Sequence, residues 1–153
     1  MTDPIDLEAP AKLTVSLRIT GVRPDGYHLI DAEMVTLSLR DRIEIRHKPG
    51  FGRPSVVYSG AWSPPSRSAD DLVSRALDAV GITDVDVRVV KEIPAGAGLG
   101  GGSADAAAVL RWAGMTDPVL ALGLGADVPF CVVGGRARVR GIGEIVEPLP
   151  ARA

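Results

Sequence analysis

The sequence predicts an α+β domain, because helical and strand patterns are mixed along it without the regular alternation of a parallel α/β fold. Apolar and polar residues alternate near the N-terminus and again before residue 90, which is typical of half-buried strands. Residues 72–80 and 103–113 instead carry apolar residues or alanine at helical spacing. With 153 residues, of which 46% are hydrophobic and 24% charged, the chain has the size and composition of one globular domain.

The first predicted strand has an apolar and a polar face. The apolar residues, which we expect to face the core, are Leu13, Val15, Leu17 and Ile19. Lys12 and Thr14 are expected on the polar face. A second strand is predicted near Ile30–Leu39 and a third near Arg42–Arg46, and the Pro-Asp-Gly sequence at residues 24–26 predicts a tight turn before them.

The middle of the chain is predicted to contain an irregular excursion, a helix and a strand. Residues 48–67 are rich in glycine and proline, which indicates a long hairpin or flexible excursion with one short strand at 56–58. A helix is expected at 72–80, with Asp70 or Asp71 as its N-cap and Gly81 at its end. The alternating valines of residues 85–89 predict the strand that follows.

The C-terminal part is predicted to be built from short elements. Asp117 and Pro118 are a typical helix start, and Gly123 limits that helix to a short one. Residues 130–133, 136–140 and 144–147 are predicted to form short strands joined by glycine turns.

A glycine-rich stretch lies between the strand at 85–89 and an alanine-rich helix. Five glycines fall between Gly96 and Gly102, Ser103 follows as the expected N-cap, and Gly114 is placed to end the helix. A glycine loop that leads into a helix N-terminus exposes several backbone N–H groups, and the helix end adds partial positive charge. The stretch therefore predicts a phosphate-binding loop.

Three other interpretations of this loop are less consistent with the sequence. It is not a P-loop, because no Gly-Lys-Ser/Thr follows the glycines. Gly96, Gly98 and Gly101 fit the dinucleotide spacing G-x-G-x-x-G, but residues 92–95 separate them from the strand, and no second strand ends in an acidic residue about twenty positions on. A flexible surface loop would not need three consecutive glycines directly before a cap serine.

Three segments resemble motifs of one enzyme family. Pro94–Ala107 resembles the phosphate-binding motif of the GHMP kinases. Ala9–Leu13 with Gly21–Leu29, and Leu124–Phe130, resemble further motifs of the branch of that family that acts on a cytidine diphosphate alcohol. The resemblance extends from about residue 9 to residue 150. It implies a two-layer GHMP-kinase N-terminal domain with a left-handed β-α-β unit around the glycine loop.

The resemblance also implies a function. We expect an ATP-dependent kinase that phosphorylates the 2-hydroxyl of a cytidine diphosphate alcohol in non-mevalonate isoprenoid precursor synthesis, with Mg²⁺ accompanying ATP. Two alternatives stay open: a nucleotide-binding GHMP domain that is non-catalytic or incomplete, and a GHMP kinase for another alcohol. The net charge of −2 and the scattered basic residues predict neither a nucleic-acid nor a membrane partner.

The loop residues and one ion pair are the expected catalytic machinery. The residues expected to hold the ATP phosphates are Pro94, Ala95, Gly96, Ala97, Gly98, Leu99, Gly100, Gly101, Gly102 and Ser103. By resemblance, Asp127 is expected to face the acceptor hydroxyl and Lys12 to pair with it, which keeps the aspartate ionised and helps remove the hydroxyl proton. Without the resemblance, Asp127 would be interpreted as a turn cap and Lys12 as a solvated lysine.

The resemblance places the substrate's cytidine end near Tyr27 and His28, with Thr14 nearby. A phenol and an imidazole can stack on a pyrimidine and hydrogen-bond its edge, although both side chains could instead merely pack on or decorate the hairpin. Thr14 stands where the family usually has asparagine, and its hydroxyl cannot present an amide. Trp62 is interpreted as a packing or surface aromatic.

Members of the family are nearly twice as long as this chain. Residues 1–153 are therefore expected to form the N-terminal domain, with the C-terminal GHMP domain absent, and a fragment, a truncated gene product and a natural one-domain form all stay open.

Two histidines and one cysteine are too few and too scattered for a metal-ligand set. The single Cys131 and the lack of a signal-peptide pattern predict a cytoplasmic protein, and nothing in the sequence predicts its oligomeric state.

Overall fold

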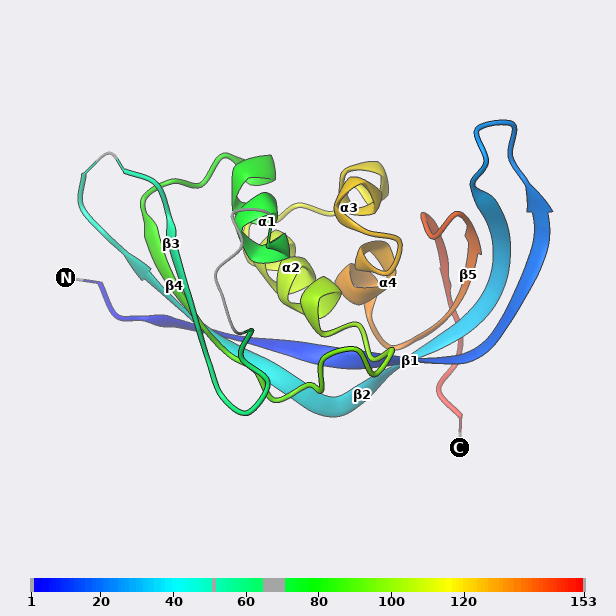
Figure 1. Cartoon of the computed structure of the whole chain (residues 1–153), viewed down its shortest axis with the longest axis horizontal. Helices are drawn as coiled ribbons and strands as arrows, with labels where there is room; N and C mark the ends of the chain where they lie inside the picture. Colours follow the sequence, from blue (N-terminus) through cyan, green and yellow to red (C-terminus); the bar gives the residue numbers. More distant parts are fainter. Residues whose placement is uncertain (1, 51, 65–70, 153) are drawn as a thin grey trace.

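The computed structural model describes residues 2–50, 52–64 and 71–152. Within these residues, one six-stranded sheet forms the first layer, and four helices cover one face of it as the second layer (Figure 1). The prediction of a two-layer α+β fold is confirmed. None of the helices in the described ranges is long and apolar enough to cross a membrane.

The long strand β2 (His28–His47) is the centre of the sheet. β1 (Ile5–Val22) pairs with it antiparallel along one edge, and the two form a hairpin whose far arm curves toward the helical layer (Figure 1). At the other edge, β4 (Val85–Val90) pairs with one end of β2 and β5 (Arg136–Gly141) with the other end. The second and third predicted strands are thus one continuous strand.

The remaining strands extend this arrangement at both ends. β3 (Ser55–Ser59) lies parallel to β4, and the two are connected through α1 as a β-α-β unit. The glycine loop follows directly after the second strand of that unit. β6 (Ile145–Pro148) pairs antiparallel with β5 at the opposite end of the sheet. The short strand predicted in the excursion is confirmed as β3, while residues 51 and 65–67 of the excursion lie outside the described residues.

The ladder is broken in the middle of β2. Residues 36–41 have no pairing with either β4 or β5, which meet the same edge of β2 from opposite ends. On the β1 side, Pro10 lies opposite Arg40 but Lys12 already lies opposite Thr36, so β2 has extra residues there. Backbone groups in such a break need other partners, and the Thr36 N–H finds one in the Gly135 carbonyl at 2.7 Å.

The helices follow the sequence signals in two cases. α1 (Leu72–Val80) begins after the predicted cap Asp71 and ends at Gly81, while Asp70, the alternative cap, lies outside the described residues. α3 (Pro118–Leu124) begins after Asp117, as predicted.

Two helix predictions were wrong. α2 (Gly101–Trp112) begins two residues before Ser103, with Gly100 as its N-cap, so Ser103 is in the first turn and is not the cap. Residues 130–133, predicted as a strand, belong to α4 (Val128–Val133). A short apolar run cannot be assigned from periodicity alone, and here Pro129 in the first turn and Gly134 at the end delimit one helical segment.

The predicted faces of β1 were also wrong. Lys12 is buried, with 7% of its surface exposed, whereas Leu13 is 43% exposed. Lys12 and Thr14 lie opposite Thr36 and Met34 and face the helical layer, where the ends of two helices cover Lys12. A bulge after Thr14 then turns Leu17 to the same side, but Leu17 lies beyond the helices and is 60% exposed.

The core lies between the sheet and the helices. Small side chains let α2 pack closely on the sheet, and its buried alanines are Ala104, Ala106, Ala107 and Ala108. The largest fully buried side chains around it are Phe130, Ile43, Ile45, Leu77, Ile93 and Leu110.

We predict that Asp71→Ala lowers the free energy of unfolding by about 1 to 2 kcal/mol, because the cap carboxylate is lost. Asp71 accepts hydrogen bonds from the Ser74 backbone N–H at 2.9 Å and from the Tyr58 hydroxyl at 2.7 Å. Urea denaturation measures the change. Asp78→Ala, an exposed position of the same helix, is the control and should change stability by less than about 0.5 kcal/mol. Equal stabilities of the two variants would contradict the capping role.

Candidate functional site

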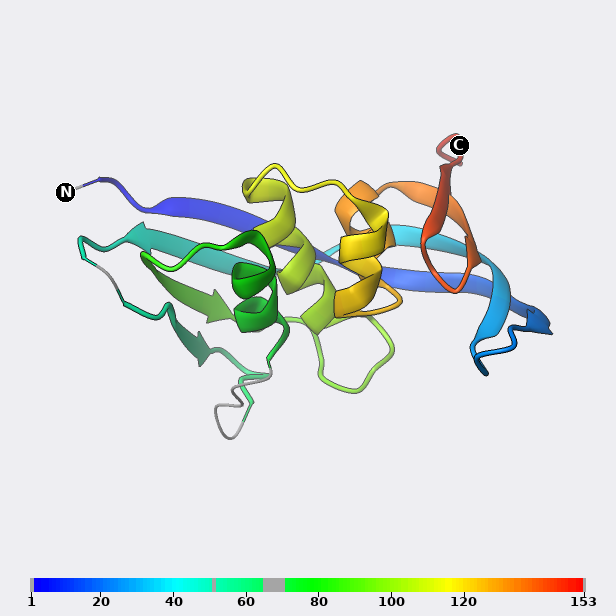
Figure 2. The same cartoon turned by 90° about the horizontal axis from the view of Figure 1, so that it is seen from above.

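The glycine loop is open toward solvent where it precedes α2 (Figure 2). Gly96, Gly98 and Gly100 have φ values of 70°, 75° and 66°, a left-handed conformation that side chains rarely adopt. A Cβ atom added at Gly96 or Gly98 would meet nothing within 4 Å, so these glycines border free space. The loop therefore leaves room for an anion beside exposed backbone and the N-terminus of α2, as a triphosphate would need.

Lys12 connects the loop to β1. Its backbone N–H donates to the Leu99 carbonyl at 2.9 Å. Its side chain lies against Gly100, where an added Cβ would be 3.0 Å from the lysine Cε and Cγ atoms. Only glycine at position 100 combines this conformation with this close approach. The phosphate loop is thus fixed next to the lysine predicted to be catalytic.

The predicted partners Lys12 and Asp127 are in contact. Lys12 Nζ lies 3.1 Å from Asp127 Oδ2 and also donates to Thr14 Oγ1 at 3.0 Å. The Asp127 side chain is 32% exposed, whereas that of Lys12 is nearly covered. The pair therefore presents its carboxylate, rather than its ammonium group, to incoming molecules.

Asp127 precedes α4 but does not cap it through its side chain. No side-chain hydrogen bond runs from Asp127 to the first turn of α4, although its carbonyl accepts the Cys131 N–H at 3.0 Å. The turn-cap interpretation therefore does not describe what the carboxylate contacts. Burial raises the pKa of the Cys131 thiol to about 12, so this neighbouring group stays protonated and is no nucleophile.

Ser103 lies between the phosphate loop and the segment that carries Asp127. Its Oγ atom is 3.8 Å from the position that a Cβ of Gly125 would occupy. It is half-buried in the first turn of α2. The serine hydroxyl thus lies near both segments, although its predicted capping role is not observed.

Tyr27 and His28 lie apart from this group, at the end of the curved hairpin (Figure 1). Tyr27 is 61% exposed, and the Arg23 guanidinium lies 5.8 Å from its ring centroid. His28 pairs with Val22 where β2 begins and is exposed. The structure therefore brings Lys12, Thr14, Asp127 and the loop together but leaves Tyr27 and His28 on a separate, accessible surface.

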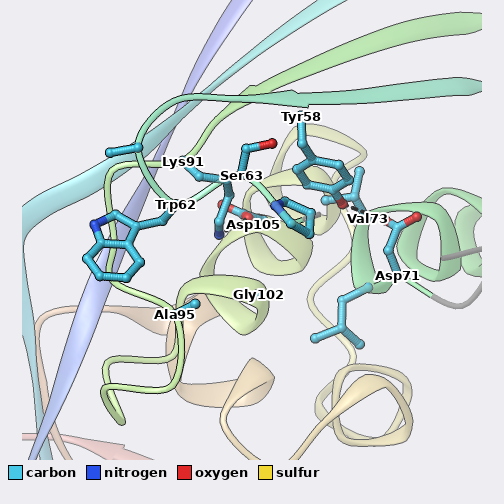
Figure 3. A pocket seen from close by; sticks show the side chains of 12 residues that line it. Tyr58, Trp62, Ser63, Asp71, Val73, Lys91, Ala95, Gly102 and Asp105 are labelled. Atoms are coloured by element: carbon cyan, nitrogen blue, oxygen red, sulfur yellow. Dashed lines mark hydrogen bonds and ion pairs between the residues drawn. The ribbon is translucent and has the colours of Figure 1, made fainter. Parts of the chain in front are cut away.

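A cavity of about 420 Å³ lies on the other side of the loop, between β3, α1 and the start of α2 (Figure 3). Tyr58, Trp62 and Pro64 line one part of it, and Ala95 and Gly102 border it from the loop and α2. The sequence did not identify this cavity. A tryptophan in a glycine- and proline-rich excursion was the only local sign of it, and it was interpreted as a packing or surface aromatic.

Lys91 and Asp105 lie at the floor of this cavity (Figure 3), and Asp41 joins them in a buried cluster. Lys91 Nζ donates to Asp41 Oδ2 at 2.5 Å and to Asp105 Oδ2 at 2.7 Å. Burial raises the pKa of Asp105 to about 8; Lys91 opposes this rise, and the nearby Asp41 carboxylate adds to it. Burial alone would lower the pKa of Lys91, but the two carboxylates outweigh it and raise that pKa. Sequence reasoning missed this cluster.

The fold and the site agree with one enzyme class. Residues 68–135, which contain the glycine loop and Asp127, match the family model described as the GHMP kinases N terminal domain. Over these residues the chain is therefore similar to the N-terminal domain of the GHMP kinases. The structure also superposes on mevalonate kinase of Methanococcus jannaschii with a TM-score of 0.58 at 13% identity, a likeness of fold alone.

More similar proteins belong to one branch of that class. The chain is 44% identical over 144 residues to 4-diphosphocytidyl-2-C-methyl-D-erythritol kinase of Paracoccus denitrificans, covering 94% of this chain and 50% of the relative. It is 42% identical over 157 residues to the enzyme of the same name from Pelotomaculum thermopropionicum, covering 92% and 53%. A crystal structure of 4-(cytidine 5'-diphospho)-2C-methyl-D-erythritol kinase matches with a TM-score of 0.72 and 36% identity, covering 95% of this chain and 55% of that one. The chain spans about half the length of the curated relatives it matches.

We predict that the free energy of unfolding falls as the pH rises from about 5 to about 8, and that Asp105→Asn reduces this fall. The folded state holds the Asp105 proton up to a pKa of about 8, whereas the unfolded chain releases it near 3.8, so each step of increasing pH favours the unfolded state. Carboxyls with lowered pKa values, such as Asp31 at about 2, change the free energy of unfolding only below about pH 5. Urea denaturation at several pH values measures both proteins, and identical pH slopes would show that Asp105 is ionised throughout.

Proposed function

We propose that this chain is the ATP-binding and catalytic half of a 4-diphosphocytidyl-2-C-methyl-D-erythritol kinase, which transfers the γ-phosphoryl group of ATP to the 2-hydroxyl of its substrate. The proposal depends mainly on the Lys12–Asp127 ion pair, which lies directly beside the glycine loop. The names of the relatives at 42% and 44% identity supply the substrate. In this proposal residues 1–153 are the N-terminal GHMP domain of the enzyme. The enzyme is cytoplasmic in this proposal, since a single cysteine, Cys131, fits a reducing compartment.

The glycine loop and the adjacent cavity would bind ATP. The free space beside Gly96 and Gly98 accommodates phosphates, and the N-terminus of α2 adds partial positive charge. The cavity of about 420 Å³ then receives the nucleoside, with Trp62 and Tyr58 as aromatic walls. Mg²⁺ bound with the nucleotide would offset the charge of the β and γ oxygens.

Lys12 and Asp127 would act on the acceptor hydroxyl. The accessible Asp127 carboxylate accepts the hydroxyl's hydrogen bond and orients its oxygen toward the γ-phosphorus. A new oxygen–phosphorus bond forms while the bond between the γ-phosphorus and the β–γ bridging oxygen breaks, ADP leaves, and the hydroxyl proton passes to Asp127. The Lys12 ammonium lies 3.1 Å from Asp127 Oδ2. It stabilises the negative charge that develops between the Asp127 carboxylate and the acceptor oxygen.

Thr14, Tyr27 and His28 would form the substrate side. The Thr14 hydroxyl accepts from Lys12, so its own hydrogen can point toward the acceptor alcohol. Tyr27 is 61% exposed and has Arg23 near its ring, and a pyrimidine can stack on the free face.

We predict that Trp62 reports ATP binding. Trp62 and Trp112 are the two tryptophans of the chain, so Trp112→Phe leaves Trp62 as the sole fluorophore. Titration of this variant with MgATP should change the emission and saturate, because a base in the cavity lies against the Trp62 indole. In the matched Trp62→Phe protein, Trp112 packs against His47 away from the cavity, and its emission should stay constant. No change with either protein would contradict nucleotide binding at this cavity.

We predict that Asp127→Asn reduces turnover by about 10²- to 10⁴-fold, because the carboxylate that orients the hydroxyl is lost. The affinity for MgATP should stay within about threefold, because Asp127 faces the acceptor side of the loop. Coupled measurement of ADP release with 4-diphosphocytidyl-2-C-methyl-D-erythritol provides the rate, and Asp78→Asn, an exposed carboxylate of α1, is the control. Comparable turnover by the Asp127 variant would show that this aspartate is misassigned. Tight MgATP binding without turnover by the unmodified chain would favour the non-catalytic alternative.

A further inference from the structure

The buried cluster of Asp41, Lys91 and Asp105 joins three elements around the glycine loop. Asp41 belongs to the middle of β2, which pairs with β1 but with neither β4 nor β5. Lys91 directly follows β4, and Asp105 lies in α2 one turn after its first residue. Asp41 and Asp105 have 0% and 1% of their surface exposed. The loop thus begins and ends at residues whose side chains converge on one point inside the protein.

Asp41 fixes the segment that leads into the loop. Its Oδ1 atom accepts the backbone N–H groups of Glu92 and Ile93 at 2.6 and 2.9 Å. Its Oδ2 atom accepts Lys91 Nζ at 2.5 Å. Donors from three consecutive residues therefore end on a single carboxylate, in place of the ladder hydrogen bonds that β2 lacks here.

Lys91 extends this anchor to the far end of the loop. Besides Asp41, its ammonium group contacts Asp105 Oδ2 at 2.7 Å. It also lies 3.2 Å from the position that a Cβ of Gly101 would occupy, so it supports the first residue of α2. The distance between the two ends of the loop is therefore set by one lysine side chain.

Stability alone is a weak explanation for such a cluster. Removing ionisable groups from water costs much of what their attraction returns, and apolar replacements of buried ion pairs are often neutral or stabilising. The Asp105 Oδ1 atom is buried and has no hydrogen-bond partner among the described residues, which adds a further cost. A geometric role explains why charges lie here better than a stabilising role does.

We propose that Asp41 is a positioning residue for phosphoryl transfer: it anchors the glycine loop through Glu92, Ile93 and Lys91, so that the loop amides and the start of α2 hold the ATP phosphates beside Lys12. This inference rests on the proposed ATP site, and it assigns to the loop a support, Asp41, that is not among the residues lining the cavity. Asp105 has a secondary role, because its contacts are with Lys91 and with Asp41 itself.

Asparagine substitutions separate the two aspartates. The Asp41 carboxylate accepts with both oxygens, and an amide has a single acceptor oxygen, so Asp41→Asn must lose the bonds on one side. Asp105 accepts with Oδ2 only, so Asp105→Asn can keep its bond to Lys91. Glu44→Gln, a half-buried ion-paired carboxylate on the same strand, is the matched control.

The experiment measures two properties of the full chain. MgATP affinity by calorimetry should fall by about tenfold or more in Asp41→Asn, fall less in Asp105→Asn, which borders the cavity, and stay within about threefold in Glu44→Gln. Amide hydrogen exchange without nucleotide should accelerate at Glu92, Ile93 and Ala104 in Asp41→Asn, while β5 amides keep their rates. If the chain turns over, the KM for ATP should rise more than kcat falls, which a purely structural loss would not produce.

The outcomes are decisive in both directions. Unchanged MgATP affinity and unchanged exchange at Glu92 and Ile93 in Asp41→Asn overturn the inference, and so does an equal effect of Asp105→Asn. If the unmodified chain does not bind MgATP, the proposed function fails, and the exchange measurement still decides the anchoring. If Asp41→Asn does not fold, Lys91→Met replaces it: Glu92 and Ile93 should stay protected while Ala104 exchanges faster. Loss of protection at all three sites in that variant contradicts the anchor.

Discussion

The candidate site depends on the break in the hydrogen-bond ladder at the middle of β2. Because β4 and β5 approach the same edge of β2 from opposite ends, residues 36–41 are left without a strand neighbour there. The glycine loop leaves β4 at this gap, and the connection from α4 reaches it from the other side, where Thr36 N–H donates to the Gly135 carbonyl. A continuous strand pairing would have kept these two segments apart. The break therefore brings Asp127 and the glycine loop to the same lysine.

Close backbone approach then sets the chemistry of this junction. The Lys12 N–H bonds the Leu99 carbonyl, and the Lys12 side chain occupies the space that a Cβ at Gly100 would need. The glycines of the loop thus have two separate functions. Gly96 and Gly98 leave free space on the outside, and Gly100 admits the lysine on the inside. Small alanines on α2 serve the same end, because they let the helix approach the sheet.

The sequence predicted what depends on neighbouring residues and failed where distant segments decide. Caps located the starts of α1 and α3, Gly81 located the end of α1, and motif resemblance located the loop, Lys12 and Asp127 before any contact was known. Alternation in β1 showed which residues share a face, but not which face the helices cover. A bulge after Thr14 then exchanged the two faces for the rest of the strand. The cluster around Lys91 gave no local signal, because Asp41 lies 50 residues away in sequence.

The two lysine–aspartate contacts differ in a way that separates their roles. Lys12 pairs with a carboxylate that is 32% exposed and bordered by the open loop, so a substrate hydroxyl can reach it. Lys91 pairs with two carboxylates that are sealed from solvent, so no acceptor can reach them without unfolding the floor of the cavity. A proton acceptor must touch the reacting group, whereas an anchor only has to resist displacement. In the proposed function, the same residue types would therefore serve transfer at the surface and geometry in the interior, and burial of the carboxylate would decide which.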